Sequence, residues 1–196
     1  MNGGHGSPPS AYLSVVPQSP RMERVAFDAV EPTAYETDAE RRGLSTPLAT
    51  ENLSLNHYRL APGERLAGLH AHPEQEEVFV VLDGEATFEV LGRRVGDAVE
   101  EVRGTVAGDV REVTVAAGEA IRFAPGEFQA GRNAGESELT VLGVGAPRDG
   151  ADVRVPKVCP DCGRGDMRPV AGEDGDSLRC PDCETVLEQP PPREEW

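Results

Sequence analysis

Two histidines and a glutamate occur close together in the segment HAHPEQEE, as His70, His72 and Glu77. Residues two apart on a strand leave the same face, so the two imidazoles would be about 6.6 Å apart along the chain and could lean onto one ion. A strand that returns after Pro73 can bring the Glu77 carboxylate to the same ion. Two imidazoles and one carboxylate leave coordination positions open, and this donor set suits non-haem iron or manganese.

The other ionisable side chains near this segment point to the chemistry less specifically. We expect Glu74 and Glu76 to be solvated charges at the rim of the site, with Glu76 as the substitute ligand if the spacing shifts by one residue. His57 could point inward on the face that it shares with Leu53 and Leu55. A core or surface histidine without a ligand role is the favoured interpretation of His57.

The four cysteines form two C-x-x-C pairs near the C-terminal end, Cys159 with Cys162 and Cys180 with Cys183. Seventeen residues separate the pairs, which matches the spacing of zinc sites. Each CPDC turn can present two thiolates to one tetrahedral Zn²⁺, and a segment of about 30 residues needs such a staple because its own core is small. The segment resembles a zinc ribbon. Redox iron bound by the same thiolates and a disulfide pair are the lesser alternatives.

Short runs of alternating and β-branched residues, separated by Gly and Pro, predict an all-β chain. The Asp83-Gly84 pair predicts a two-residue hairpin turn between two of these strands. The acidic segment 92–111 is weakly patterned, and we expect an extended hairpin or a surface excursion there. Seven or more short strands favour a sandwich or a small barrel. The predicted strands cover residues 52–60, 69–72, 77–82, 85–91, 112–115, 120–123 and 139–144.

Two strings of residues resemble the paired motifs of the cupin family. The first is HAHPEQEEVFVVLDG, from His70 to Gly84, and the second is GEAIRFAPGEFQAGRN, from Gly118 to Asn133. The resemblance spans about residues 52–146. It implies a double-stranded β-helix, which is a jelly-roll barrel, with a divalent metal such as Fe, Mn, Ni or Zn inside it.

The second string departs from the cupin pattern at two positions. Ala124 stands where the family carries proline, and Gln129 stands where the family carries a histidine as the fourth metal ligand. An amide oxygen is a neutral and weaker donor than imidazole, so we expect Gln129 either to be a weak fourth ligand or to hydrogen-bond a bound water. The 33 residues between Gly84 and Gly118 exceed the length typical of compact cupins, which predicts a lid or an interface.

Composition shifts divide the chain into an expected disordered leader (1–21), an N-terminal arm (22–51), the barrel (52–146), a linker (147–157), the cysteine module (158–187) and a tail (188–196). The leader is rich in Gly, Pro and Ser, and either Met1 or Met22 could be the start of translation. No apolar run reaches the roughly 20 residues of a membrane helix, and no secretion signal is recognisable, so we expect a cytoplasmic protein with no membrane contact.

The chain is strongly acidic, with a formal net charge of −16. This charge argues against nucleic acid or an anionic membrane as partner. Lys157 is the only lysine among 19 cationic residues, and acid is spread along the whole chain, which favours a halophilic protein. In concentrated salt the Debye length falls to about 3 Å, so a carboxylate-rich surface loses most of its self-repulsion.

Two functional hypotheses follow. In the first, the barrel metal acts as a Lewis acid on a small polar molecule; the resemblance implies an enzyme of dioxygenase, isomerase or decarboxylase type, without selecting one. In the second, the barrel binds a small molecule without catalysis, as a sensor, and the zinc ribbon contacts a protein partner. The resemblance also implies a homodimer. Acidic residues offset the arginines of the cysteine module, so the ribbon favours protein over nucleic acid.

Overall fold

The computed structural model describes residues 22–33, 39–100, 106–150, 152–171 and 176–188. The predicted leader and most of the predicted tail lie outside these residues. Apart from one short 3-10 turn, η1 (Phe27–Ala29), every regular element of the described residues is a β-strand. The all-β prediction is therefore confirmed. No helix within the described ranges has the length and hydropathy needed to cross a bilayer.

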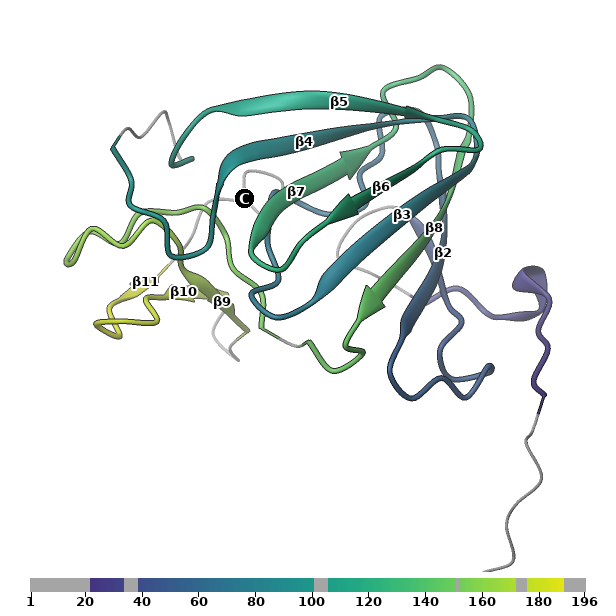
Figure 1. Cartoon of the computed structure of the whole chain (residues 1–196), viewed down its shortest axis with the longest axis horizontal. Coiled ribbons are helices and arrows are strands. Elements are labelled where there is room, and N and C mark those ends of the chain that lie inside the picture. Colours follow the sequence, from purple (N-terminus) through teal and green to yellow (C-terminus); the bar gives the residue numbers. More distant parts are fainter. Residues whose placement is uncertain (1–21, 34–38, 101–105, 151, 172–175, 189–196) are drawn as a thin grey trace, which may run out of the picture.

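Two antiparallel sheets form the barrel (Figure 1). One has five strands in the order β1-β2-β8-β3-β6, and the other has three strands in the order β5-β4-β7. The bounds are β1 (Glu40–Gly43), β2 (Ser54–Leu60), β3 (Glu76–Asp83), β4 (Glu85–Arg94), β5 (Val110–Ala116), β6 (Ala120–Phe123), β7 (Glu127–Arg132) and β8 (Leu139–Ala146).

Apolar side chains from the two sheets meet in the larger of two core clusters in the barrel. Strand β8 alternates strictly between buried and half-buried residues, as expected for a strand with one face on the core. Phe79, Phe88 and Phe123 cluster with ring centroids 5.3 to 6.2 Å apart. The core also contains Tyr58, Leu60, Val81, Val115, Leu139 and Val141. This packing holds the strands in place. The same strands carry the polar residues described below.

Two strands were missing from the sequence prediction. Strand β1 lies in the segment expected to be an irregular arm, and it forms an edge of the larger sheet by pairing with β2. Strand β7 has no apolar alternation because four successive residues, from Phe128 to Gly131, are buried on both faces. A strand covered on both faces loses the period of two by which it would be recognised.

The predicted hairpin at Asp83-Gly84 is wrong. Strand β3 pairs with β6 and β8, whereas β4 pairs with β5 and β7, so the chain crosses from one sheet to the other at this turn. Gly84 adopts a φ of +81°, and a Cβ built there would lie 2.8 Å from the carbonyl oxygen of Glu138. The Asp83-Gly84 pair does form a turn. The close approach of Glu138 shows that this turn packs against another loop and does not join two paired strands.

The cysteine module forms a third small sheet beside one end of the barrel (Figure 1). Its strands are β9 (Arg168–Val170), β10 (Ser177–Arg179) and β11 (Val186–Glu188), in the order β11-β10-β9. Val155, Met167 and Leu178 pack with two of the cysteines in a core separate from that of the barrel. The module therefore has few apolar residues to hold it together, as its size predicts.

The two CPDC turns of the module are built alike. The backbone N–H of Gly163 donates to the carbonyl of Cys159 at 3.0 Å, and that of Glu184 donates to the carbonyl of Cys180 at 3.1 Å. Gly163 and Glu184 both have positive φ, of 75° and 63°. The internal repeat seen in the sequence is therefore a repeat of backbone conformation, which turns two thiols of each pair to the same side.

We predict that Gly84→Ala destabilises the barrel more than Gly118→Ala. Both glycines have positive φ, which costs an alanine about 1–2 kcal/mol. Only at Gly84 does a new Cβ also meet backbone, so about 1–3 kcal/mol of steric strain is added there, whereas nothing lies within 4 Å at Gly118. Urea unfolding of both variants measures the difference. Equal losses of unfolding free energy in the two variants would contradict the close packing of Gly84 against Glu138, where the chain passes from one sheet to the other.

Candidate metal centre

The segment that carries the two histidines is held between β7 and the chain that leads to the cysteine module. His70 and Gln129 exchange two backbone hydrogen bonds, of 3.0 and 2.8 Å. On the other side, Ala71 and Arg154 exchange two more, both of 2.8 Å. The predicted strand at 69–72 is thus a pair of isolated bridges rather than part of a long ladder. The bridges nevertheless keep the backbone extended, so His70 and His72 leave the same face.

The structure brings His70, His72 and Glu77 together. One ligand atom from each lies within 4.8 Å of the others, and the Nε2 atom of His72 is 3.8 Å from Oε1 of Glu77. The imidazole rings are nearly perpendicular, with centroids 5.2 Å apart. Glu77 is near the start of β3, where its register partners are Phe123 and Gly145. All three side chains are partly buried.

Both imidazoles are prepared to act as ligands. The Nδ1 atom of His70 is 2.7 Å from the carbonyl oxygen of Gly68. Because a carbonyl only accepts, the proton is on Nδ1, and the lone pair of Nε2 faces the site. Burial lowers the pKa of His72 below its usual 6.5, against the opposing effect of Glu77. A neutral imidazole is the form that binds metal.

Gln129 lies beside these residues but makes a different contact from the one expected. Its Nε2 amide donates to Oε2 of Glu77 at 3.0 Å and lies 3.5 Å from Nε2 of His70. The side chain is almost fully buried. In this orientation Gln129 holds the carboxylate in place. Turning its amide oxygen toward an ion would require the amide group to rotate, so metal ligation by Gln129 stays a prediction.

The donor set and spacing fit one divalent ion. Ligand atoms about 2.1 Å from an ion in tetrahedral geometry are roughly 3.4 Å from each other. The 3.8 Å between His72 and Glu77 is close to this value, and the upper limit of 4.8 Å for the trio requires only a small contraction. Two imidazoles and a carboxylate suit iron, manganese, nickel and zinc alike, so the donors do not select one metal.

The remaining acidic and basic candidates lie outside this centre. Glu76, the substitute ligand, pairs with Arg122 on the exposed side of β3. Glu74 is exposed. His57 is buried, but it packs against the ring of Phe27 at 4.7 Å, and it does not line the cavity described next. The structure does not group these three residues with His70, His72 and Glu77.

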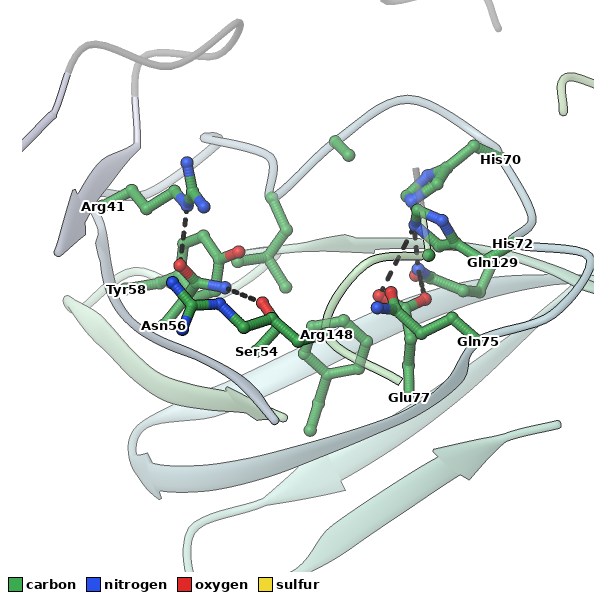
Figure 2. A pocket seen from close by; sticks show the side chains of 14 residues that line it. Arg41, Ser54, Asn56, Tyr58, His70, His72, Gln75, Glu77, Gln129 and Arg148 are labelled. Atoms are coloured by element: carbon green, nitrogen blue, oxygen red, sulfur yellow. Dashed lines mark hydrogen bonds and ion pairs between the residues drawn. The ribbon is translucent and has the colours of Figure 1, made fainter. Parts of the chain in front are cut away.

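The candidate metal centre forms one end of a cavity of about 200 Å³. At the other end, as Figure 2 shows, lie Arg41, Ser54, Asn56, Tyr58 and Arg148. Arg41 donates to Asn56 at 2.9 Å, and Arg148 donates to the backbone carbonyl of Thr50. The apolar ring of Phe79 also contributes to the lining. The cavity therefore has a cationic end and a metal-ligating end.

Sequence reasoning missed this cationic end. The alternation in strand β2 offered two faces, and the face of Ser54, Asn56 and Tyr58 lines the cavity rather than the face of His57. Arg41 and Arg148 reach the cavity from β1 and from the loop after β8, and no motif marks either residue.

The four cysteines form a second candidate centre. The Sγ atoms of Cys159 and Cys183 are 3.5 Å apart, as are those of Cys162 and Cys180. All four lie within 4.8 Å of one another, and none forms a disulfide. Thiolates about 2.3 Å from a tetrahedral Zn²⁺ are roughly 3.8 Å apart, which these distances approach. The arrangement fits a zinc ribbon.

Comparisons with known proteins agree with the barrel. The Cupin domain family model matches residues 56–145. The polyketide cyclase RemF from Streptomyces resistomycificus is 22% identical, with a TM-score of 0.54 over 72% of this chain and 89% of that one. A sugar phosphate isomerase from a cupin superfamily, from Silicibacter pomeroyi, is 20% identical, with a TM-score of 0.52 over 86% of this chain and 97% of that one.

Recombinant oxalate oxidase is 21% identical with a TM-score of 0.45, and the match covers 62% of this chain but only 55% of the oxalate oxidase chain. None of the curated proteins matches this chain. Identities this low show a shared fold and no more. Because the barrel topology and the family match coincide over the same residues, residues 56–145 form a cupin domain, which is followed by a zinc-ribbon-like module.

Proposed function

We propose that the barrel holds one divalent metal ion with His70, His72 and Glu77 and uses it to bind a small anionic molecule. The observation that supports this proposal is that ligand-type atoms of His70, His72 and Glu77 lie together at one end of a cavity that has two arginines at its other end. A volume of about 200 Å³ is below the roughly 300–1,000 Å³ of sites for drug-sized ligands. The ligand should therefore be small.

The charge of the cavity favours an anion. The whole chain carries 35 acidic residues against 19 lysines and arginines. The cavity lining reverses this balance, with Arg41 and Arg148 against the single carboxylate of Glu77. A divalent ion bound by Glu77 would add two further positive charges. Carboxylate and phosphate groups match both ends, because they bind hard metal ions and form hydrogen bonds with guanidinium groups.

The residues around the ion have distinct roles in this proposal. The ion supplies Lewis acidity when it is bound. Gln129 keeps the Glu77 carboxylate directed at the ion, through the 3.0 Å hydrogen bond. Arg148 and Arg41 orient the far end of the ligand. The apolar rings of Phe79 and Tyr58 limit access of water to the middle of the cavity.

One feature of the lining favours binding without catalysis as the second candidate. Apart from the three proposed metal ligands, the cavity lining within the described residues contains no histidine, aspartate or glutamate. A proton-transfer reaction usually requires such a side chain near the substrate. Catalysis of dioxygenase, isomerase or decarboxylase type would thus depend on the metal ion and on the ligand's own groups.

We also propose how the protein assembles with other chains. We expect the barrel to form a homodimer through an edge strand and the zinc ribbon to contact a protein partner. Both expectations derive from the family resemblance and from the acidity of the module. Light scattering in high salt measures the first, and a monomer at micromolar concentration would contradict it.

The first prediction concerns metal content. Purified protein should contain two metal ions per chain, one in each centre. His72→Ala should remove the barrel ion and keep the thiolate-bound zinc, whereas Cys162→Ser should sharply weaken retention of that zinc. Elemental analysis after desalting gives both numbers. A His72→Ala variant with undiminished metal content would rule out the barrel centre.

The second prediction concerns Gln129. Replacing it by histidine supplies a stronger ligand at a position already next to Glu77 and His70. Gln129→His should therefore strengthen barrel metal binding by about tenfold, or about 1.4 kcal/mol. Competition with a chelator measures the affinity. Gln129→Ala is the comparison, and it should bind more weakly than the parent because Glu77 loses its hydrogen bond. Affinity unchanged in both variants would show that residue 129 does not face the ion.

The third prediction concerns the cationic end. Arg148→Gln should weaken the binding of malonate to the metal-loaded protein by about tenfold, since a guanidinium to carboxylate contact is worth about 1.5–3 kcal/mol. Arg59→Gln is the charge-matched control, because Arg59 pairs with Glu138 on the exposed side of β2. Titration calorimetry compares the two. Equal effects would mean that only the net charge matters.

A further inference from the structure

We propose that the cysteine module positions the metal ligands of the barrel, so that the two metal centres are energetically coupled. This inference rests on the proposed function in that it requires a metal ion in the barrel. It goes beyond that function because it assigns the module a task within the same chain. The coupling element is the residue pair Arg154-Val155, which lies between the histidine segment and the module.

A continuous series of backbone hydrogen bonds connects the two centres. Ala71, between the two histidines, exchanges two bonds of 2.8 Å with Arg154. The next residue, Val155, exchanges bonds of 2.9 and 3.0 Å with Met167 of the module. Ala71 and Met167 are fully buried and Val155 is nearly so, so water does not compete for these bonds. The backbone of the histidine segment is thus linked to the backbone of the module through Arg154 and Val155.

A buried carboxylate fixes this connection. Asp166 has no exposed surface, and it accepts hydrogen bonds from Arg154 at 3.0 Å, from Arg164 at 3.1 Å and from the backbone N–H of Gly96 at 3.1 Å. Gly96 lies in the loop after β4, Arg154 in the connecting strand and Arg164 in the first CPDC turn. One side chain therefore joins the barrel, the connection and the zinc-binding turn. Losing a partner of a buried ion pair costs several kcal/mol.

The surfaces around this carboxylate are closely packed. Arg93 of β4 donates to the carbonyl of Gly165 at 2.5 Å. A Cβ built on Gly165 would lie 2.1 Å from a methyl group of Val99, so the module backbone touches the barrel loop directly. The backbone N–H of Ala107 donates to Pro156. Arg93, Val99 and Ala107, which belong to the long segment in which we expected a lid or an interface, supply these contacts with the module and with the linker before it.

The small size of the module determines what the loss of zinc would do to the histidine segment. With a core of a few residues it depends on zinc for its fold. Without zinc, Met167 and Asp166 would lose their fixed positions, and Arg154 would no longer hold Ala71. His70 and His72 would then sample positions in which they do not both face Glu77. Loss of groups that orient metal ligands typically costs 10-fold to 100-fold in metal affinity.

Two carboxylates of the module offer a matched pair of variants. Asp166 and Asp182 both accept hydrogen bonds from Arg164, but Asp182 is exposed, and the hydrogen bonds from Arg154 and Gly96 go to Asp166. Asp166→Asn and Asp182→Asn remove the same charge. Manganese prefers oxygen and imidazole to thiolate donors, so Mn²⁺ added to zinc-loaded full-length protein reports on the barrel centre.

The experiment measures Mn²⁺ affinity from the free-ion paramagnetic resonance signal, together with hydrogen exchange of the Ala71 amide. We expect Asp166→Asn to weaken Mn²⁺ binding by at least about tenfold and to speed exchange at Ala71, with Asp182→Asn close to the parent in both. Far-ultraviolet circular dichroism confirms that the barrel is folded. A folded Asp166→Asn variant with unchanged Mn²⁺ affinity and unchanged exchange would overturn the proposal.

Zinc removal supplies a second test that does not depend on Asp166. Because coupling of binding free energies is reciprocal, saturating Mn²⁺ should also slow the loss of zinc to a chelator. The His72→Ala variant should lose this protection. If the parent binds no Mn²⁺ at all, the proposed function fails, whereas the exchange of Ala71 on zinc removal still tests whether the module holds the histidine segment. Zinc loss that is independent of Mn²⁺ in a parent that binds it would exclude coupling.

Discussion

The structure depends on one constraint, which is that the short segment from His70 to His72 stays extended and flat. The two histidines and Glu77 come from a bridge segment and from the start of β3, and their ligand atoms lie within 4.8 Å of one another. The segment is too short to hold itself, and Pro73 ends its pairing. Backbone hydrogen bonds to Gln129 on one side and to Arg154 on the other supply the support. Placement of the ligands is thus a property of three distant parts of the chain.

Much of this arrangement could be predicted from local patterns. The strands at 77–82, 85–91 and 120–123 were recognisable because each has one apolar face, and the ligand trio was recognisable because its spacing is itself local. Strand β7 could not be recognised, since burial on both faces removed its period of two. The crossing at Gly84 could not be either, because an Asp-Gly turn looks the same whether the next strand pairs with the previous one or enters the other sheet.

The cavity shows a second limit of sequence reasoning. Arg41 and Arg148 lie far from each other and from the ligands in the chain, and only the closed barrel brings them to one cavity. In an acidic chain, the positions of a few arginines indicate a binding site better than the number of arginines does. Those in the module mostly form ion pairs with aspartates, as Arg164 does with Asp166 and Arg168 does with Asp152. The arginines of the cavity line a space large enough for a small ligand.

Separate apolar clusters hold the barrel and the cysteine module. The barrel has two apolar clusters, and the module has four thiols and a small apolar cluster. Asp166 is buried, and its charge is balanced by Arg154 of the linker and Arg164 of the module, while the backbone N–H of Gly96 in the loop after β4 also donates to it. Such a site specifies how the parts dock, since few other arrangements would satisfy the carboxylate.

The central claim is that the barrel is a metal site, and anomalous diffraction from crystals of the manganese-loaded protein tests it most directly. We expect an anomalous difference peak inside the barrel, about 2.2 Å from Nε2 of His70, Nε2 of His72 and a carboxylate oxygen of Glu77. Density for manganese only elsewhere, with both imidazoles turned away from Glu77, would contradict it.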